Sequence, residues 1–193
     1  MSRALLLLVG CSATLLVFGL WIPFKALVAQ EMLELAWAES QARQSEARPW
    51  PWADTWPVAK LEMPELDVSM IVLDGLHGES LAFGPGKLVA GADGPVILAG
   101  HRDTHFSHLQ HLAPGNPVRL QGQDQRWQDY RVTSIRVVDS RKELINTHTL
   151  AAGTLLLVTC YPFDSLDARG PLRYVVEAHP VYALEQKDTV AAL

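Results

Sequence analysis

The sequence predicts a mainly β domain, either a closed β-barrel or a β-sandwich, carried on an N-terminal membrane helix. The first part of the chain is one long apolar run, whereas from residue 58 onward short apolar segments alternate with turn residues. Only one short stretch of this second part is predicted to be helical, which favours an all-β architecture. With the apolar N-terminus set aside, the 193-residue chain has room for one domain with a substantial core.

Residues 1–24 are predicted to be a single-pass membrane anchor. Within them, residues 4–24 contain no charged side chain, and at 1.5 Å per residue this stretch is roughly 30 Å long, the thickness of the hydrocarbon core. A signal peptide usually has a shorter apolar region, so we expect the helix to remain uncleaved. Leu8–Cys11 resembles a lipoprotein processing box, but few apolar residues precede it. We expect the N-terminus in the cytoplasm and the rest of the chain on the other side of the membrane.

Residues 25–49 are predicted to form a juxtamembrane helical stalk. Positions 25–47 contain no glycine or proline and are rich in helix-forming residues. An apolar stripe recurs there at helical spacing, formed by Leu27, Met32, Leu35 and Ala36. Such a stripe either packs on the following domain or on a partner helix, and a solvated spacer helix is an equally good interpretation.

The next segment, residues 49–57, is rich in tryptophan and proline. Its three prolines exclude regular secondary structure. Its three tryptophans are costly to leave in water, so we predict that the segment wraps across an apolar groove of the domain. A membrane-interface belt and a lid are the alternatives. The barrel domain is predicted to span residues 50–185, followed by a tail over residues 186–193.

Seven strands and one short helix are predicted after this segment. Turn residues, for example those at positions 122–125, separate the strands. The helix is predicted at Gly78–Phe83, and the strands are Val58–Met63, Val68–Val72, Val96–Gly100, Pro117–Leu120, Arg126–Asp139, Gly153–Cys160 and Leu172–Tyr182. The stretch Gly84–Lys87 lacks the spacing and the Ser/Thr of a phosphate-binding loop. No cofactor is predicted, and a formal charge of −5 argues against binding of nucleic acid.

Cys160 ends a buried apolar strand, and Pro162 shortly after it stops strand pairing. A free cysteine is usually an inert, buried apolar residue. However, Cys160 is placed where a rigid strand passes into a loop, a common position for catalytic groups. The only other cysteine, Cys11, lies in the predicted membrane helix, so no disulfide is expected.

Two further reactive side chains lie at strand ends. His101 follows the apolar run Val96–Gly100, and Arg173 opens the last strand. If these strands are neighbours, both side chains meet Cys160 at one end of the barrel. A thiolate is a nucleophile whose pKa nearby cations lower, an imidazole can protonate a departing amine, and a guanidinium can bind an oxyanion. This trio is suited to acyl transfer through a thioester.

The same stretches resemble the motifs of the sortases, cysteine transpeptidases that anchor proteins to cell surfaces. Val158–Cys160 is similar to their nucleophile motif, Ala99–Thr104 to their histidine segment, and Leu172–Val176 to their arginine strand. The stretch Val158–Phe163 is most similar to class D and to the Gram-negative type, class GN, and the tryptophan-rich segment and single anchor also resemble the latter. The resemblance covers roughly residues 50–182.

The resemblance implies an eight-stranded barrel, the eighth strand being expected within Arg126–Asp139. It implies that Cys160 attacks the Thr–Gly bond of an LPXTG-like sorting signal, with His101 as acid and base and Arg173 binding the oxyanion. An amine, or water, would then resolve the thioester. Expected substrate-binding or supporting residues are Thr159, Asp103, Thr104 and Tyr161. The expected location is the inner (cytoplasmic) membrane, with the catalytic domain facing the periplasm or exterior.

Several alternatives remain open from the residues alone. Zinc could be bound by Cys160 with a run of histidines, His101, His105, His108 and His111, although their spacing matches no structural zinc pattern and no metal is predicted. An L,D-transpeptidase would carry an arginine shortly after the cysteine, where Tyr161 and Pro162 stand here. Arg169 is the rival of Arg173. The non-enzymatic alternative is a membrane-tethered β-barrel binding module with an inert cysteine.

Overall fold

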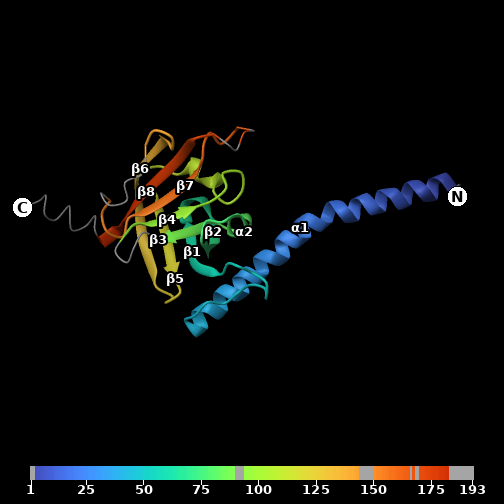
Figure 1. Cartoon of the computed structure of the whole chain (residues 1–193), viewed down its shortest axis with the longest axis horizontal. Helices are drawn as coiled ribbons and strands as arrows, with labels where there is room; N and C mark the ends of the chain where they lie inside the picture. Colours follow the sequence, from blue (N-terminus) through green and yellow to red (C-terminus); the bar gives the residue numbers. More distant parts are fainter. Residues whose placement is uncertain (1–2, 90–93, 144–149, 166, 168–169, 183–193) are drawn as a thin grey trace, which may run out of the picture.

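The computed structural model consists of one long helix followed by a closed eight-stranded barrel (Figure 1), which confirms the predicted fold class. It describes residues 3–182 apart from 90–93, 144–149, 166 and 168–169. The predicted tail at residues 186–193, and the rival Arg169, lie outside the described residues.

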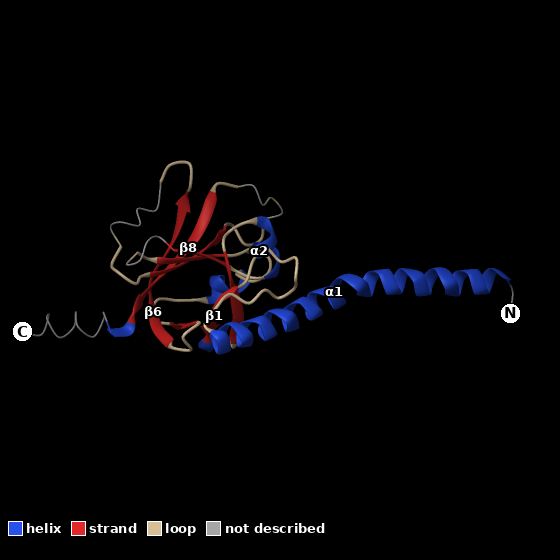
Figure 2. Cartoon of the chain, turned by 60° about the horizontal axis from the view of Figure 1, so that its bottom comes forward, coloured by secondary structure: helices blue, strands red, loops and turns tan. Residues whose placement is uncertain are grey.

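A single helix, α1 (Arg3–Arg43), runs through residues 3–24 of the predicted anchor and residues 25–43 of the predicted stalk. Residues 44–49, the end of the predicted stalk, are not helical. Its N-terminal half projects away from the barrel (Figures 1 and 2), and its apolar side chains there, such as Leu15 and Phe18, are exposed. By length and composition it is the one described helix able to cross a membrane. The helix continues from the membrane segment into the stalk, with Pro23 close to their boundary.

The C-terminal half of α1 packs on the barrel, as one of the alternatives for the stalk anticipated. Leu33 is fully buried and Trp37 nearly so, in a cluster with Ile71 and Leu73 of strand β2 (Val68–Asp74). Burying two large apolar side chains in this way stabilises the docked helix by a few kcal/mol, at about 1.5–3 kcal/mol for each.

The predicted apolar stripe of the stalk was right for Ala36, which is buried, and wrong for two of its leucines. Leu27 and Leu35 are 68% and 70% exposed. The buried face consists of Ala29, Leu33, Ala36, Trp37 and Ser40. Its alanines and serine allow the helix to approach the sheet closely. Because such small residues contribute little to a hydrophobic pattern, a stripe assigned from the leucine and methionine positions includes exposed residues.

The tryptophan-rich segment is docked only in part. The ring of Trp50 packs edge-on against Phe83, with centroids 4.9 Å apart, as the docking prediction required. Trp56 is half-buried, and its carbonyl accepts a hydrogen bond from the backbone N–H of Asp74. Trp52, in contrast, is 81% exposed, so for this residue the docking prediction was wrong.

The eight strands close in the order β1-β2-β3-β4-β7-β8-β6-β5. Their bounds are β1 Pro57–Met63, β2 Val68–Asp74, β3 Gly86–Val89, β4 Val96–Ala99, β5 Pro117–Gly122, β6 Trp127–Asp139, β7 Leu155–Cys160 and β8 Leu172–Pro180. Among the described residues, three short helices lie between them, η1 Pro64–Leu66, α2 Gly78–Phe83 and η2 Ser107–His111. The pairs β2–β3 and β4–β7 are parallel, and closure leaves no sheet edge unpaired.

The eighth strand is not where the sequence placed it. The segment at 126–139 forms one 13-residue strand, β6, and the additional strand is β3. A side chain at Gly86 would bring its Cβ to 2.0 Å from the Gly75 carbonyl oxygen, so glycine is needed here for close approach of two backbones. Gly84, Pro85 and Gly86, which lead into and open β3, indicated a loop, and a four-residue strand is too short to outweigh that signal.

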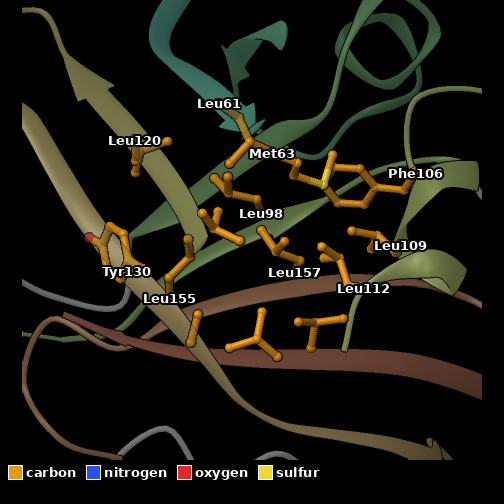
Figure 3. Packing of buried hydrophobic residues seen from close by; sticks show 14 of the residues in the cluster. Leu61, Met63, Leu98, Phe106, Leu109, Leu112, Leu120, Tyr130, Leu155 and Leu157 are labelled. Atoms are coloured by element: carbon orange, nitrogen blue, oxygen red, sulfur yellow. The ribbon is translucent and has the colours of Figure 1, made fainter. Parts of the chain in front are cut away.

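The barrel interior is a continuous apolar core that includes Leu61, Met63, Leu98, Phe106 and Leu157 (Figure 3). Strand β7 contributes Leu155 and Leu157 to this core. Leu156 and Val158 alternate with them and belong to a separate cluster on the outer face of the sheet. Cys160 follows at the same spacing, so the strand presents its thiol on the outer face, at the end of the barrel.

Candidate active site

The parallel pairing of β4 with β7 brings the histidine and cysteine segments together. Ala99 pairs with Val158, and the Gly100 N–H donates to the Val158 carbonyl at 3.2 Å. His101 and Cys160 each come two residues after this pair. The two side chains therefore emerge from adjacent strand ends at the same level of the barrel, as the sequence predicted for neighbouring strands.

Strand β8 places the arginine on the other side of the cysteine. Cys160 pairs directly with Arg173 in the antiparallel β7–β8 ladder. Directly opposed residues of such a ladder present their side chains on the same face. Cys160 thus lies between β4, which His101 follows by two residues, and β8, whose second residue is Arg173. His101 is exposed and Cys160 partly exposed, so a substrate can approach both.

The guanidinium of Arg173 is held by one of its nitrogens. Nη1 donates to the carbonyls of Gly170 at 2.7 Å and Leu172 at 2.9 Å. Its Nε and Nη2 make no hydrogen bond to any other residue that the structure describes. A guanidinium presents its donors in a fixed fork, so anchoring one corner also orients the remaining donors.

The His101 segment is fixed to the core by Phe106. The Phe106 N–H donates to the His101 carbonyl at 3.0 Å, and the Phe106 ring is fully buried in the barrel. A Cβ on Gly100 would lie 3.0 Å from that ring, which accounts for a glycine immediately before the histidine. The histidine loop is thereby anchored at both of its ends.

Arg102 is the principal residue that sequence reasoning missed. Its side chain is 3% exposed, and it donates to the carbonyls of Pro162 at 2.7 Å, Ser165 at 2.5 Å and Asp167 at 3.1 Å. Its Nε also pairs with Asp103 at 3.1 Å. One buried guanidinium thus joins the loop that carries His101 to the loop that follows Cys160. The only sequence signal was its place beside His101, and a charged loop residue is ordinarily solvated.

The four expected supporting residues have different surroundings. Thr159 is buried, and its hydroxyl donates to the Gly100 carbonyl at 2.7 Å, so it ties β7 to the histidine segment from within the sheet. Asp103 pairs with Arg102, and the hydroxyl of Thr104 lies 3.3 Å from Nδ1 of His105. Tyr161 alone lies in an open hollow next to the cysteine.

That hollow has a volume of about 510 Å³ and is lined by Gln110 and by the four residues after Cys160, Tyr161–Asp164. The rings of Tyr161 and Phe163 pack against Tyr174, with centroids 6.1 and 5.0 Å away. Aromatic rings therefore line the hollow, and their packing against Tyr174 of β8 holds them in place. A second hollow, of about 360 Å³, is formed at the β5–β6 hairpin and contains none of the candidate site residues.

His105 is the electrostatic neighbour of His101. Burial lowers the pKa of His105 below its ordinary value, the positive charge of His101 lowers it further, and a hydrogen bond to the Phe83 backbone opposes both effects. These effects together favour the neutral form of His105. Across the described residues, no group of three His, Cys, Asp or Glu is arranged to hold a metal ion, so the zinc alternative has no ligand set there.

Comparison with known proteins identifies the family. A model of the sortase domain matches residues 61–181. The chain belongs to the sortase family. Among its relatives, Sortase D of Bacillus subtilis (strain 168) is 29% identical over 120 residues, which are 60% of this sortase and 60% of that protein. The match thus spans less than two thirds of that relative's length.

Solved structures show the same fold. The Clostridium perfringens Sortase D5 transpeptidase superimposes with a TM-score of 0.58 at 19% identity, over 80% of this sortase and 98% of that chain. The catalytic domain of B. anthracis SrtD is 28% identical, with a TM-score of 0.51 over 65% and 87% of the two chains. The similarity to Sortase D of Bacillus subtilis and to SrtD of B. anthracis agrees with the class D resemblance. It does not bear on the Gram-negative type, which stays a prediction.

Replacing Arg102 tests its role in joining the two loops. Arg102→Lys keeps the charge but replaces three separate donor nitrogens with one, which cannot reach all of these partners, so we expect the free energy of unfolding of the sortase to fall by roughly 2–3 kcal/mol. Chemical denaturation measures this. Arg126→Lys is the matched control, because that side chain is 89% exposed and should change stability by less than about 0.5 kcal/mol. Equal stability of the two variants would contradict the role given to Arg102.

The lowered pKa of His105 predicts how stability depends on pH. Below the ordinary histidine pKa the unfolded chain binds a proton that folded His105 does not, so this residue makes stability fall as pH decreases through about 6.5. The melting temperature of the wild type should therefore drop more steeply between neutral and mildly acidic pH than that of His105→Gln. If the melting temperatures of the two proteins fall equally with pH, His105 has no lowered pKa and this prediction is contradicted.

Proposed function

We propose that this sortase is a cysteine transpeptidase that cleaves an LPXTG-like sorting signal between Thr and Gly. The acyl group would pass to Cys160 as a thioester and then to an amine, or to water. The observation that carries the proposal is the placement of partly exposed Cys160 between strand ends that bear His101 and Arg173. Membership of the family and likeness to class D sortases support it.

In the first step the thiolate of Cys160 attacks the carbonyl carbon of the substrate threonine, and the carbonyl electron pair moves onto oxygen. The donors of Arg173 that are not held by the loop carbonyls would bind this oxyanion. As the intermediate collapses, the C–N bond breaks and protonated His101 gives its proton to the departing glycine nitrogen. The thioester remains on Cys160.

In the second step an amine attacks the thioester, and His101, now neutral, accepts the proton that the attacking nitrogen loses. Cys160 leaves as a thiolate, and a new amide replaces the cleaved one. The aromatic hollow beside Cys160 suits the apolar Leu-Pro portion of a sorting signal.

The apolar half of α1 supports a membrane-anchored enzyme. We place its N-terminus in the cytoplasm and the barrel on the exterior or periplasmic side of the cytoplasmic membrane, where sorting signals emerge. A catalytic domain spanning residues 50–185 is part of the same proposal. The binding-module alternative has no observation in its favour, because Cys160 is partly exposed and flanked by two candidate catalytic groups.

Turnover of a panel of LPXTG-like peptides, followed by chromatography of the products, tests this proposal. We expect Cys160→Ala to abolish cleavage because no nucleophile remains. Arg173→Lys should lower kcat/KM by about 10²-fold, since the planar fork at the oxyanion is lost. Arg126→Lys serves as the control, because the Arg126 side chain is 89% exposed on the β5–β6 hairpin. Retained cleavage by Cys160→Ala would exclude the mechanism.

A further inference from the structure

We propose that Arg102 is a positioning residue for substrate binding. It holds the loop after Cys160 in the shape that forms the aromatic hollow beside the thiol, and it thereby sets the preference for the Leu-Pro portion of the sorting signal. This inference rests on the proposed function and assigns one of its specificity determinants. Arg102 acts through the backbone of that loop.

The segment from which Arg102 extends is fixed without its side chain. At one end, the Thr159 hydroxyl of β7 donates to the Gly100 carbonyl at 2.7 Å. At the other end, the Phe106 N–H donates to the His101 carbonyl at 3.0 Å, and the Phe106 ring is fully buried in the barrel core (Figure 3). Removal of the guanidinium should therefore leave His101 in place.

The loop after Cys160 depends on the guanidinium much more. Arg102 donates to the carbonyls of Pro162, Ser165 and Asp167, at 2.7, 2.5 and 3.1 Å. Within the loop, Ser165 makes local bonds, since its hydroxyl donates to the Asp167 carbonyl at 3.2 Å. Such local bonds fix neighbouring residues relative to each other and do not attach the loop to the barrel.

Strand β8 holds only the beginning of this loop. The Tyr161 N–H donates to the Leu172 carbonyl at 3.1 Å, and the rings of Tyr161 and Phe163 pack on Tyr174. Pro162, which stands between these two rings in the chain and also lines the hollow, is the residue whose carbonyl Arg102 binds at 2.7 Å. The hollow is thus held by β8 through its rings and by Arg102 through its backbone.

The burial of Arg102 makes this arrangement persistent. The side chain is 3% exposed, so a loop that moved away would leave a buried charge without its carbonyl partners. The hollow is therefore formed before the substrate arrives, and the substrate binds without having to order the loop. When the binding-competent shape is populated for only part of the time, the apparent affinity falls by that fraction.

This role has a distinct kinetic signature. Cys160 and His101 keep their places in β7 and the histidine segment when the guanidinium is lost, so the chemical steps after binding are little affected. Loss of Arg102 should raise KM and leave kcat nearly unchanged. A residue that positioned His101 for proton transfer would instead lower kcat.

The test compares wild type and Arg102→Lys on two soluble peptides, an LPXTG-like signal and the same peptide with alanine in place of its leucine and proline. For the signal we expect KM to rise about tenfold or more and kcat to stay within about threefold. The ratio of kcat/KM between the two peptides should fall, because the hollow no longer distinguishes them. Hydrogen exchange should become faster in Tyr161–Asp167 and stay unchanged in Gly100–Phe106.

Two variants control for effects that are only structural. Val118→Ala lowers stability at a fully buried position of β5, a strand that pairs with β1 and β6. Arg126→Lys changes a side chain that is 89% exposed. Both should keep the wild-type ratio between the two peptides. If Arg102→Lys does not fold, Arg102→Gln, which buries no charge, is measured in its place.

An unchanged ratio between the peptides, or unchanged hydrogen exchange in the loop after Cys160, overturns this inference alone. Fast exchange of that loop in the wild type overturns it as well, whether or not the variants fold. No turnover of the signal peptide by the wild type overturns the proposed function and this inference together.

Discussion

The parallel pairing of β4 with β7 is the constraint on which the candidate site depends. Gly100 and Thr159, which are 59 positions apart in the chain, are joined by a hydrogen bond of 2.7 Å at the end of this pair. The pairing sets the level at which His101 and Cys160 emerge, and β8 completes the site by pairing Arg173 with the cysteine. A slip of one residue in β7 would turn Cys160 toward the core.

Two further contacts keep the loops beyond the strands in place. Phe106 fixes the far end of the histidine segment in the barrel core. Arg102 crosses from that segment to the loop after Cys160, with backbone carbonyls and one carboxylate around its charge. A buried guanidinium without partners would be strongly destabilising, so these loops remain together as long as the charge stays buried.

Most strands, helix α2 and the strand ends that carry Cys160 and His101 could be predicted from the sequence, because each depends on residues close together in the chain. Apolar runs and the turn residues around them located Cys160 and His101. The features that it missed depend on tertiary contacts. Strand β3 exists because Gly86 can lie against Gly75, and Arg102 is buried because two distant loops surround it. The stalk docks through alanine, serine and a few large residues, a face that hydrophobicity alone does not distinguish.

The most direct test of the account is mass spectrometry of the enzyme, quenched in acid while it turns over an LPXTG-like peptide. The account predicts an adduct on the proteolytic fragment that contains Cys160, with the mass of the substrate portion ending at threonine, released by hydroxylamine as expected for a thioester. Substrate cleavage without any adduct, or an adduct on another residue, would contradict it.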